Sequence, residues 1–295
     1  MHIGVGLPSA IPTVKSEFIL DWARKAESGP FSSLSVLDRI VYPSYDPLIT
    51  LAAAAGVTQR IRLMTTVLLA PLHSAAALAK QAASLDALSG GRLTLGLGVG
   101  GREDDFEAME APLHRRGKRF DRQLATMARL WSGEHFSETA GPIGPAPVQE
   151  GGPEVLIGGY TEAALKRVGH WNQGYIAGAF PPPFVPHFFQ LAEKSWLEAG
   201  RSGKPRLIAC SYYGLGPDAT ERTISYITHF YSFLGPMAQM MANAVPTTPE
   251  AVRTLIDTYK DMNADELILW PCIPELDQLS RLEELVAGSV TSPTM

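Results

Sequence analysis

The chain has 295 residues, of which 45% are apolar and 19% are charged, and its formal net charge is −5. This composition excludes global disorder, and an acidic balance without clustered Lys and Arg argues against nucleic acid as a partner. No apolar run reaches the roughly 18 residues of a membrane span, and residues 1–5 lead into a strand-like segment without a basic leader. The sequence therefore predicts a cytoplasmic protein with no membrane partner. Cys210 and Cys272 lie in separate apolar segments, which predicts two buried thiols and no metal site.

Short strand-like runs alternate with amphipathic helical runs along the whole chain, as in a parallel sheet built from βα units. The eight predicted strands are His2–Leu7, Ser33–Asp38, Ile61–Ala70, Leu93–Val99, Glu154–Gly158, Gly174–Gly178, Arg206–Leu215 and Asp265–Pro271. The predicted helices between them include Lys15–Glu27, Pro47–Val57, Ser74–Leu88 and Gly117–Trp131. Eight repeats without a composition break favour a single (β/α)8 TIM barrel over residues 1–295, and a doubly wound open sheet is the alternative.

Two segments depart from this alternation. Residues 137–152 are rich in Gly and Pro, which predicts a long loop excursion. Residues 226–245 carry aromatic and Met side chains around the Gly235-Pro236 pair. This segment is predicted to be either an outer helix with a turn or a mobile lid over a hydrophobic substrate, because Met-rich surfaces adapt to varied ligands.

A glycine-rich run matches the G-x-G-x-x-G pattern at Gly96, Gly98 and Gly101. In a dinucleotide site such glycines follow a strand and open a helix, whereas here they alternate with leucines inside a predicted strand. Three carboxylates in residues 103–105 would also repel a phosphate at the next helix start, and Asp121 lies in a helix repeat instead of at a strand end. The run therefore predicts a strand with one bare face, which leaves room for a flat ligand.

The predicted second strand ends in a carboxylate, a guanidinium and a phenol, from Asp38, Arg39 and Tyr42. In a barrel, residues at this end of the strands carry function. An ordinary ion pair between Asp38 and Arg39 is the alternative interpretation.

The predicted third strand carries two hydroxyls, Thr65 and Thr66, and is followed by His73. Buried hydroxyls need a hydrogen-bond partner, which is either backbone or ligand. His73 could act as an acid, a base or a donor near neutral pH, and a purely structural role is the alternative.

Gly158 and Gly159 follow the predicted fifth strand and precede a helix. Glycines let the backbone approach a ligand closely, and the first helical amides, from Tyr160 to Glu162, can point at one phosphate. Thr161 is the predicted N-cap. Glu162 weakens this interpretation, and a plain turn with a capped helix is the alternative.

Three segments together resemble the bacterial luciferase-like flavin-dependent oxidoreductases. They are Asp46-Pro-Leu48 through Thr58–Leu63, then Ala79–Leu93 with the glycine strand that follows it, and Ile157-Gly-Gly-Tyr160. The resemblance implies a (β/α)8 barrel, usually a dimer, that binds reduced FMN or the deazaflavin coenzyme F420 at the carboxyl ends of its strands.

The resemblance also implies roles for single residues. It places Asp38 near the ring. It also places Thr65, Thr66 and Val67 along the edge of the ring, and at these residues the family often has a non-proline cis peptide. Gly98 and Gly100 are expected to give clearance to the ring.

The phosphate is expected at Gly158, Gly159 and Tyr160, and the ribityl side chain beside Gly174-Tyr175-Ile176. The sequence departs from the family at Arg39, where many members have a histidine. Arg39 stays protonated and cannot act as a base, but it can stabilise an oxyanion or an anionic substrate. His73 or Tyr42 would then supply the proton.

The leading functional prediction is a monooxygenase in which reduced FMN, delivered by a separate reductase, reacts with O2 and oxygenates a small hydrophobic substrate. The close alternative is F420-dependent hydride transfer on the same fold. A flavin-binding barrel without catalytic activity and a dinucleotide dehydrogenase are the more distant alternatives. A homodimer is expected.

Overall fold

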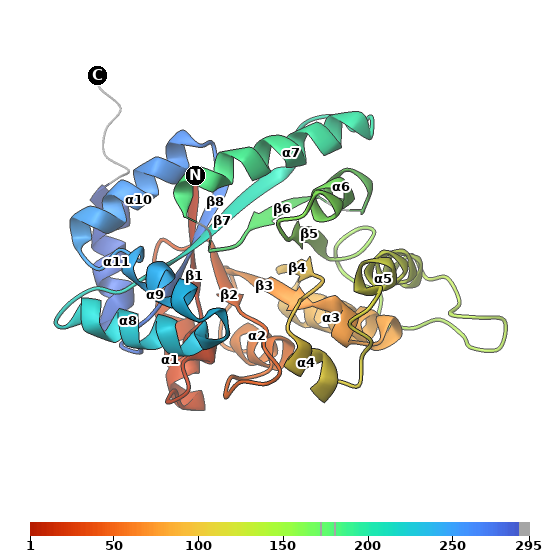
Figure 1. Ribbon diagram of the computed structural model, residues 1–295. Coiled ribbons are helices and arrows are strands. Elements are labelled where there is room, and N and C mark those ends of the chain that lie inside the picture. The colour runs from red at the N-terminus through yellow and green to blue at the C-terminus, as the bar shows by residue number, and fades with distance from the viewer. Residues whose placement is uncertain (172, 180, 289–295) are drawn as a thin grey trace, which may run out of the picture.

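The computed structural model describes residues 1–171, 173–179 and 181–288, so residues 289–295 of the predicted domain lie outside it. Eight parallel strands form a closed barrel in which each strand pairs with its neighbours in chain order and β8 pairs with β1 (Figure 1). The strands are β1 His2–Gly6, β2 Ser33–Val36, β3 Arg62–Leu69, β4 Leu93–Gly98, β5 Glu154–Gly158, β6 Gly174–Ala177, β7 Arg206–Tyr213 and β8 Glu266–Pro271. The predicted (β/α)8 TIM barrel is confirmed, and the closed ring excludes the open sheet.

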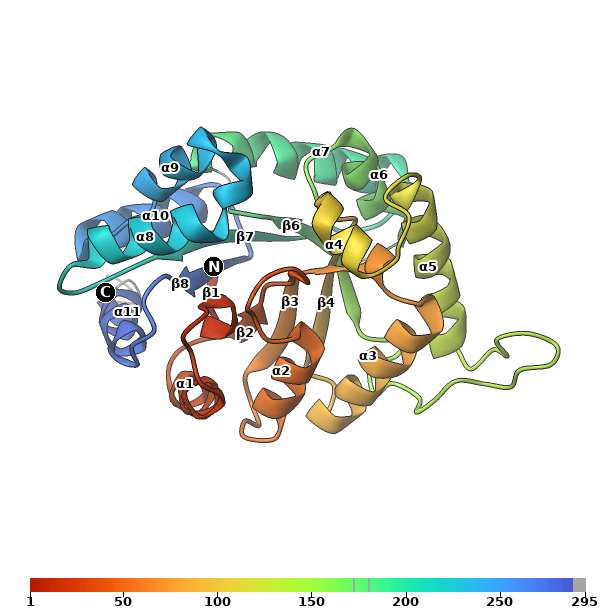
Figure 2. The same ribbon diagram turned by 60° about the horizontal axis from the view of Figure 1, so that its bottom comes forward.

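Helices surround the barrel between successive strands (Figure 2). They are α1 Ser16–Ser28, α2 Pro47–Ala55, α3 Ala75–Ser89, α4 Glu103–Ala108, α5 Arg116–Trp131, α6 Glu162–Trp171, α7 Val185–Glu198, α8 Ala219–Phe230, α9 Pro236–Asn243, α10 Pro249–Asp261 and α11 Asp277–Gly288. Local sequence sets several of their ends. Asp46 caps α2 by accepting from the Ile49 amide at 2.8 Å, and Gly90, at a φ of 67°, ends α3.

The alternation of side chains along the strands divides the apolar core into two layers. On β4, Leu93, Leu95 and Leu97 are fully buried in the layer between barrel and helices. The second layer fills the barrel itself, with Ile176 and Ile268 among its members. This packing explains why the strands read as apolar runs, since both faces of a barrel strand are covered.

Two excursions leave the barrel. Residues 132–153 form a loop that projects away from it between α5 and β5, in yellow-green in Figure 1, with a bridge between His135 and Pro142. After β7 the chain forms α8, a short 3-10 turn at Ser232–Leu234 and α9, and the two helices pack side by side (Figures 1 and 2). Within the described ranges, no helix has both the length and the apolar character that crossing a membrane requires.

Candidate functional site

A cavity of about 420 Å³ lies at the carboxyl ends of the strands. This end of a βα barrel holds ligands because the loops that follow the strands meet there. The structure brings many of the expected cofactor-binding residues to the lining of this cavity: Thr66, Val67, Gly98, Gly100, Gly158, Gly159, Tyr160 and Thr161. The other expected site residues lie outside that lining: Asp38, Arg39, Tyr42, Thr65, His73 and Tyr175.

The side chain of Val67 occupies the space that two glycines leave free. A Cβ atom at Gly98 would lie 2.7 Å from Val67 Cγ2, and a Cβ atom at Gly158 would lie 2.6 Å from Val67 Cγ1. The glycines therefore make room for a side chain of the protein, and Val67 in turn borders the cavity. This differs from the expectation that Gly98 clears space directly for a ring.

Backbone carbonyls satisfy both buried threonine hydroxyls of β3. Thr65 Oγ1 donates to the Gly96 carbonyl at 2.7 Å, and Thr66 Oγ1 donates to the Val36 carbonyl at 3.2 Å. The sequence left open whether these hydroxyls bond to the backbone or to a ligand, and the structure shows that both bond to the backbone. The peptide bond between Thr66 and Val67 is cis, at the place where the resemblance implies one.

One corner of the cavity, at the start of α6, has features that suit an anion. α6 begins at Glu162, directly after the glycine pair, and the Ala164 amide donates to Thr161 Oγ1 at 3.3 Å, which confirms the predicted cap. Gly159 has a φ of 136°, and a Cβ atom there would lie 2.8 Å from Ala164 Cβ, so this turn requires glycine. The amides of the first turn and the helix dipole favour a negative charge at this point.

A guanidinium lines the same cavity. Arg116 lines the cavity, and its Nε donates to the Gly100 carbonyl at 2.9 Å, which fixes the direction of the side chain. Glu162 forms an exposed ion pair with Lys166 at 2.7 Å, so its negative charge is partly neutralised. A cation and a helix start thus both line this cavity, which has no other charged side chain in its lining among the described residues.

Asp38 lies at the edge of this cavity, between the lining residues Leu37 and Leu69. Its side chain is 8% exposed. The Leu69 amide donates to Oδ2 at 2.8 Å, while Oδ1 has no hydrogen-bond partner among the described residues. Burial raises the pKa of Asp38 to about 6, although the bond from Leu69 acts in the opposite sense. A carboxyl group with a free oxygen and a pKa near neutrality is suited to hold and release a proton.

Arg39 points away from Asp38 and holds the end of α8. Its Nη1 donates to the Phe230 carbonyl at 2.7 Å, and its guanidinium lies 4.5 Å from the Tyr42 ring centroid and 5.6 Å from that of Phe233. The described residues show no ion pair between Arg39 and Asp38, so that alternative is wrong. The catalytic role expected for Arg39 has no support in this placement, because Nη1 and Nη2 donate to the backbone carbonyls of Phe230 and Val41 and the side chain does not line the cavity.

The Tyr42 side chain and the His73 backbone are engaged outside the cavity, while His73 Nε2 is buried without a hydrogen-bond partner among the described residues. The Tyr42 hydroxyl lies 2.9 Å from His229 Nδ1 on α8. The His73 carbonyl accepts from Gln123 Nε2 at 2.7 Å, and burial lowers the pKa of the His73 ring, which keeps it neutral at pH 7. Neither residue lines the cavity.

Tyr175 supports the anion corner from behind. Its hydroxyl donates to the Gly159 carbonyl at 2.9 Å, and its ring packs edge-on against Phe189. The residue is fully buried, so it orients the glycine turn and is not itself part of the wall.

The cavity residues that were not predicted from the sequence include Arg116, Tyr231 and Trp270. Arg116 precedes the predicted helix Gly117–Trp131 by one residue, in a stretch that carries no motif. Tyr231 belongs to the aromatic segment 226–245, and the aromatic composition of that segment was the only sequence feature that could have indicated a role for Tyr231 in the cavity. Trp270 sits in a predicted apolar strand, where a tryptophan is ordinary core.

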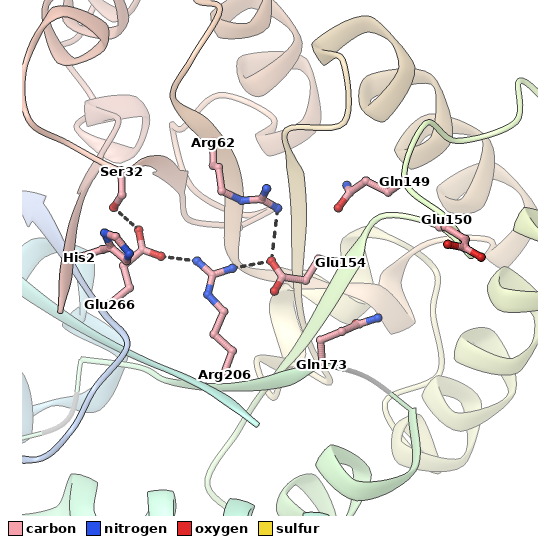
Figure 3. Close-up of a pocket in the computed structure, with 10 residues that line it drawn as sticks. His2, Ser32, Arg62, Gln149, Glu150, Glu154, Gln173, Arg206 and Glu266 are labelled. Carbon is pink, nitrogen blue, oxygen red and sulfur yellow. Dashed lines mark hydrogen bonds and ion pairs between the residues drawn. The ribbon is translucent and has the colours of Figure 1, made fainter. Parts of the chain in front are cut away.

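A larger cavity, of about 700 Å³, lies at the opposite end of the barrel, where the strands begin (Figure 3). Arg206 lies between Glu154 and Glu266 and donates to each at 2.5 Å, and Arg62 approaches Glu154 at 3.4 Å (Figure 3). The charges of Arg62, Glu154, Arg206 and Glu266 are paired with one another, and this end of a barrel serves stability. We therefore take the cavity at the carboxyl end as the candidate functional site.

Metal ligands do not gather at either cavity. Over residues 1–171, 173–179 and 181–288, no group of three or more His, Cys, Asp and Glu side chains is arranged to hold an ion.

Comparison with known proteins places the chain in a family. The model of the family described as "Luciferase-like monooxygenase" matches residues 1–266. The uncharacterized protein Rv0940c of Mycobacterium tuberculosis is 30% identical over 235 residues, which cover 70% of this chain and 80% of that protein. The uncharacterized protein Rv0953c of the same organism is 32% identical over 193 residues, which cover 63% and 68%.

Solved structures share the fold. Monooxygenase RslO1 from Streptomyces bottropensis superposes with a TM-score of 0.78 at 23% identity and 98% coverage of both chains. An F420-dependent secondary alcohol dehydrogenase superposes with a TM-score of 0.81 at 17% identity and covers 99% of this chain and 100% of its own. The family includes flavin monooxygenases and F420-dependent oxidoreductases. The match over residues 1–266 shows that the chain belongs to the luciferase-like monooxygenase family.

Proposed function

We propose that this protein is an oxidoreductase that uses reduced FMN and O2 to oxygenate a small hydrophobic substrate. The observation that carries the proposal is the cavity in which a helix start and Arg116 adjoin an apolar space. FMN has the complementary parts, a phosphate and a flat ring. Bound there, FMN would supply the redox chemistry, and the protein would supply orientation and a dry environment.

The described residues fit such a cofactor. The α6 amides and Arg116 would hold the phosphate, with Thr161 capping the helix and Tyr175 supporting the turn. Val67 and Gly100 would border the ring. Asp38 would hold a proton at Oδ1, beside the ring edge. We assign no proton transfer to Tyr42 or His73, because neither lines the cavity and, within the described part of the chain, neither is hydrogen-bonded to a residue that lines it, whereas Asp38 accepts from the lining residue Leu69.

The test of the reaction is oxygen dependence. Purified protein supplied with chemically reduced FMN is expected to convert apolar candidate substrates to products that carry one atom of ¹⁸O from labelled O2. Turnover in the absence of O2 would contradict the monooxygenase reaction.

F420-dependent hydride transfer is the second candidate, since F420 also combines a flat ring with a phosphate and would use the same helix start. Competition distinguishes the two. Reduced FMN is expected to bind and to be displaced by F420 only at excess. Binding of F420 alone would replace the first proposal with the second.

A flavin-binding barrel without catalytic activity would bind the cofactor and show no turnover with any substrate. The free Oδ1 of Asp38 argues against it, because a buried oxygen without a partner lowers stability and has no use in a purely structural site. Any product formed by the protein with reduced flavin would eliminate this alternative.

We also propose a homodimer and delivery of reduced FMN by a separate reductase. The exposed side of α2 supports the dimer, since it presents Ile49, Ala52 and Ala53 without a charged side chain, and Ile49 is 72% exposed. Sedimentation is expected to give a dimer for the protein and a monomer for Ile49→Lys. A monomeric wild-type protein would contradict the dimer.

A further inference from the structure

The cavity has a second end, away from the phosphate corner. The anion site belongs to β5 and α6, whereas Leu37, Tyr231 and Trp270 follow or belong to β2, β7 and β8, on the other side of the ring of strands. Arg116 is the only charged side chain that lines the cavity among the described residues. The second end is therefore uncharged and largely aromatic.

Among the residues that line this second end, the side-chain hydrogen-bonding groups are already committed, with one exception. Trp270 Nε1 donates to Ser35 Oγ at 2.9 Å, and Thr66 Oγ1 donates to the Val36 carbonyl. The Tyr231 hydroxyl lies 3.0 Å from the Tyr212 hydroxyl. Two hydroxyls in contact share one hydrogen bond and use only one of their two protons, so one proton remains.

Burial decides which of the two protons remains. Tyr212 is 2% exposed, and its hydroxyl has no other hydrogen-bond partner among the described residues. If Tyr231 donated to Tyr212, the Tyr212 proton would be buried without an acceptor, which is unfavourable. Tyr212 is therefore the donor of the pair, and the Tyr231 proton is free to point into the cavity that its side chain lines.

The position of Tyr231 is fixed from both sides along the chain. Arg39 binds the carbonyl of Phe230, the residue before it. Two positions after it, the Phe233 ring lies 4.2 Å from the guanidinium of Arg102. Burial raises the pKa of Tyr231 to about 12, so the phenol keeps its proton at neutral pH. A rigid, protonated donor in an apolar wall selects ligands by a matching acceptor.

We propose that the substrate is an apolar molecule with one uncharged oxygen acceptor, such as a ketone or an ether, and that the Tyr231 hydroxyl donates a hydrogen bond to that oxygen. The proposal rests on the function proposed above, because it takes this cavity as the substrate site. It makes Tyr231 a specificity-determining residue and Arg39 the positioning residue that holds it.

The test compares acetophenone with α-methylstyrene, in which a CH₂ group replaces the carbonyl oxygen. Dissociation constants are measured by ligand-observed NMR on wild-type protein and on Tyr231→Phe, each with and without FMN. The affinity ratio of ketone to alkene is expected to fall about three- to tenfold in the variant, the range for one neutral hydrogen bond. A ratio that changes less than twofold, or a wild-type protein that binds neither probe, would overturn the proposal.

Two further variants sharpen the result. Tyr226→Phe makes the same chemical change in a tyrosine outside the cavity lining and is expected to leave the ratio unchanged. Tyr212→Phe is expected to keep or lower the ratio, and a rise would show that Tyr231 uses its proton on Tyr212, contrary to the proposal. Loss of FMN binding with an intact ketone preference would contradict the cofactor assignment alone.

Discussion

At the scale of single residues, Asp38 has a buried carboxyl group with only one of its two oxygens hydrogen-bonded. Asp86 provides the contrast, because its two carboxylate oxygens accept three hydrogen bonds from Val148 and Gln149. Both side chains are buried, yet only Asp38 is placed at the edge of the cavity. Unpaired buried groups of this kind lower stability and are typical of functional sites.

Asp38→Asn is therefore expected to stabilise the protein at pH 8. The pKa of Asp38 is raised from 3.8 to about 6 in the folded state, so folding becomes less favourable as the pH rises from about 4 to about 6. Two pKa units correspond to about 3 kcal/mol, which is lost fully above pH 6. Urea unfolding at pH 4 and pH 8 measures this, and the two proteins are expected to be of similar stability at pH 4.

Asp86→Asn is the matched control, and it is expected to be less stable than wild type at pH 8 because it weakens satisfied hydrogen bonds. If Asp38→Asn behaved like this control, the raised pKa of Asp38 would be wrong.

At the scale of elements, three neighbouring strands meet through Val67 on β3, which packs against Gly98 on β4 and Gly158 on β5. A similar contact joins the loop after β2 to the end of α8, through Arg39 and Phe230. In both places the shape of the cavity depends on a side chain from a different element.

Gly98→Ala is expected to weaken FMN binding by tenfold or more. The new Cβ atom would lie 2.7 Å from Val67 Cγ2, so Val67 must move toward the cavity. Fluorescence titration measures the affinity, and circular dichroism checks that the barrel is folded.

The double variant Gly98→Ala with Val67→Ala removes the colliding methyl groups and is expected to regain part of the affinity. Gly141→Ala, in the projecting loop where a Cβ atom meets nothing within 4 Å, is the control without effect. Unchanged affinity in Gly98→Ala would show that the cofactor lies elsewhere.

Arg39→Lys keeps the charge but loses the planar contacts with the rings of Tyr42 and Phe233 and the directed bond to the Phe230 carbonyl. We expect faster amide exchange over residues 230–236 and about 1–2 kcal/mol lower stability. Hydrogen exchange with mass spectrometry measures the first effect. Arg129 forms an exposed ion pair with Glu134, so Arg129→Lys is expected to change neither the amide exchange nor the stability. Equal amide protection over residues 230–236 in the two variants would contradict the role given to Arg39.

At the scale of the whole molecule, the two ends of the barrel differ in kind. The end where the strands begin carries paired charges, with Glu266 only 1% exposed, whereas the other end carries an apolar cavity with an unpaired carboxyl oxygen. Stability and ligand binding are therefore separable by mutation.

Glu266→Gln is expected to lower the free energy of unfolding by about 2 kcal/mol. This loss is somewhat smaller than for a fully buried pair, because Arg206 still forms its ion pair with Glu154. FMN affinity is expected to stay unchanged. Glu162→Gln breaks an exposed pair and is expected to change stability by no more than about 0.5 kcal/mol. A loss of FMN affinity in Glu266→Gln would contradict the separation.

The order and type of the strands could be predicted from the sequence because each βα unit carries its own periodicity. The fifth strand has the predicted bounds, Glu154–Gly158. The second ends at Val36 instead of Asp38, since the Asp38 carboxylate binds the backbone of another strand end, at Leu69. Such departures come from tertiary contacts, which no local pattern encodes.

The cavity was predictable only in part, for the same reason. The glycine turn and its cap at Thr161 are local features and could be read directly. The orientation of Arg39 depends on Phe230, 191 positions away, and the space beside Gly98 and Gly158 is filled by Val67 from β3. Arg116 reaches the site from a helix whose sequence shows only an amphipathic repeat.

The central claim is that the carboxyl-end cavity binds a phosphate-bearing flavin through the start of α6 and Arg116. The most direct measurement compares the affinities of reduced FMN and reduced riboflavin, titrated anaerobically against the wild-type protein and Arg116→Met. We expect the wild-type protein to prefer FMN at least tenfold, and we expect Arg116→Met to lose most of that preference, since a charge-assisted bond to phosphate contributes about 1.5–3 kcal/mol. Equal affinity for the two flavins in the wild-type protein, or no binding of either, would contradict the account.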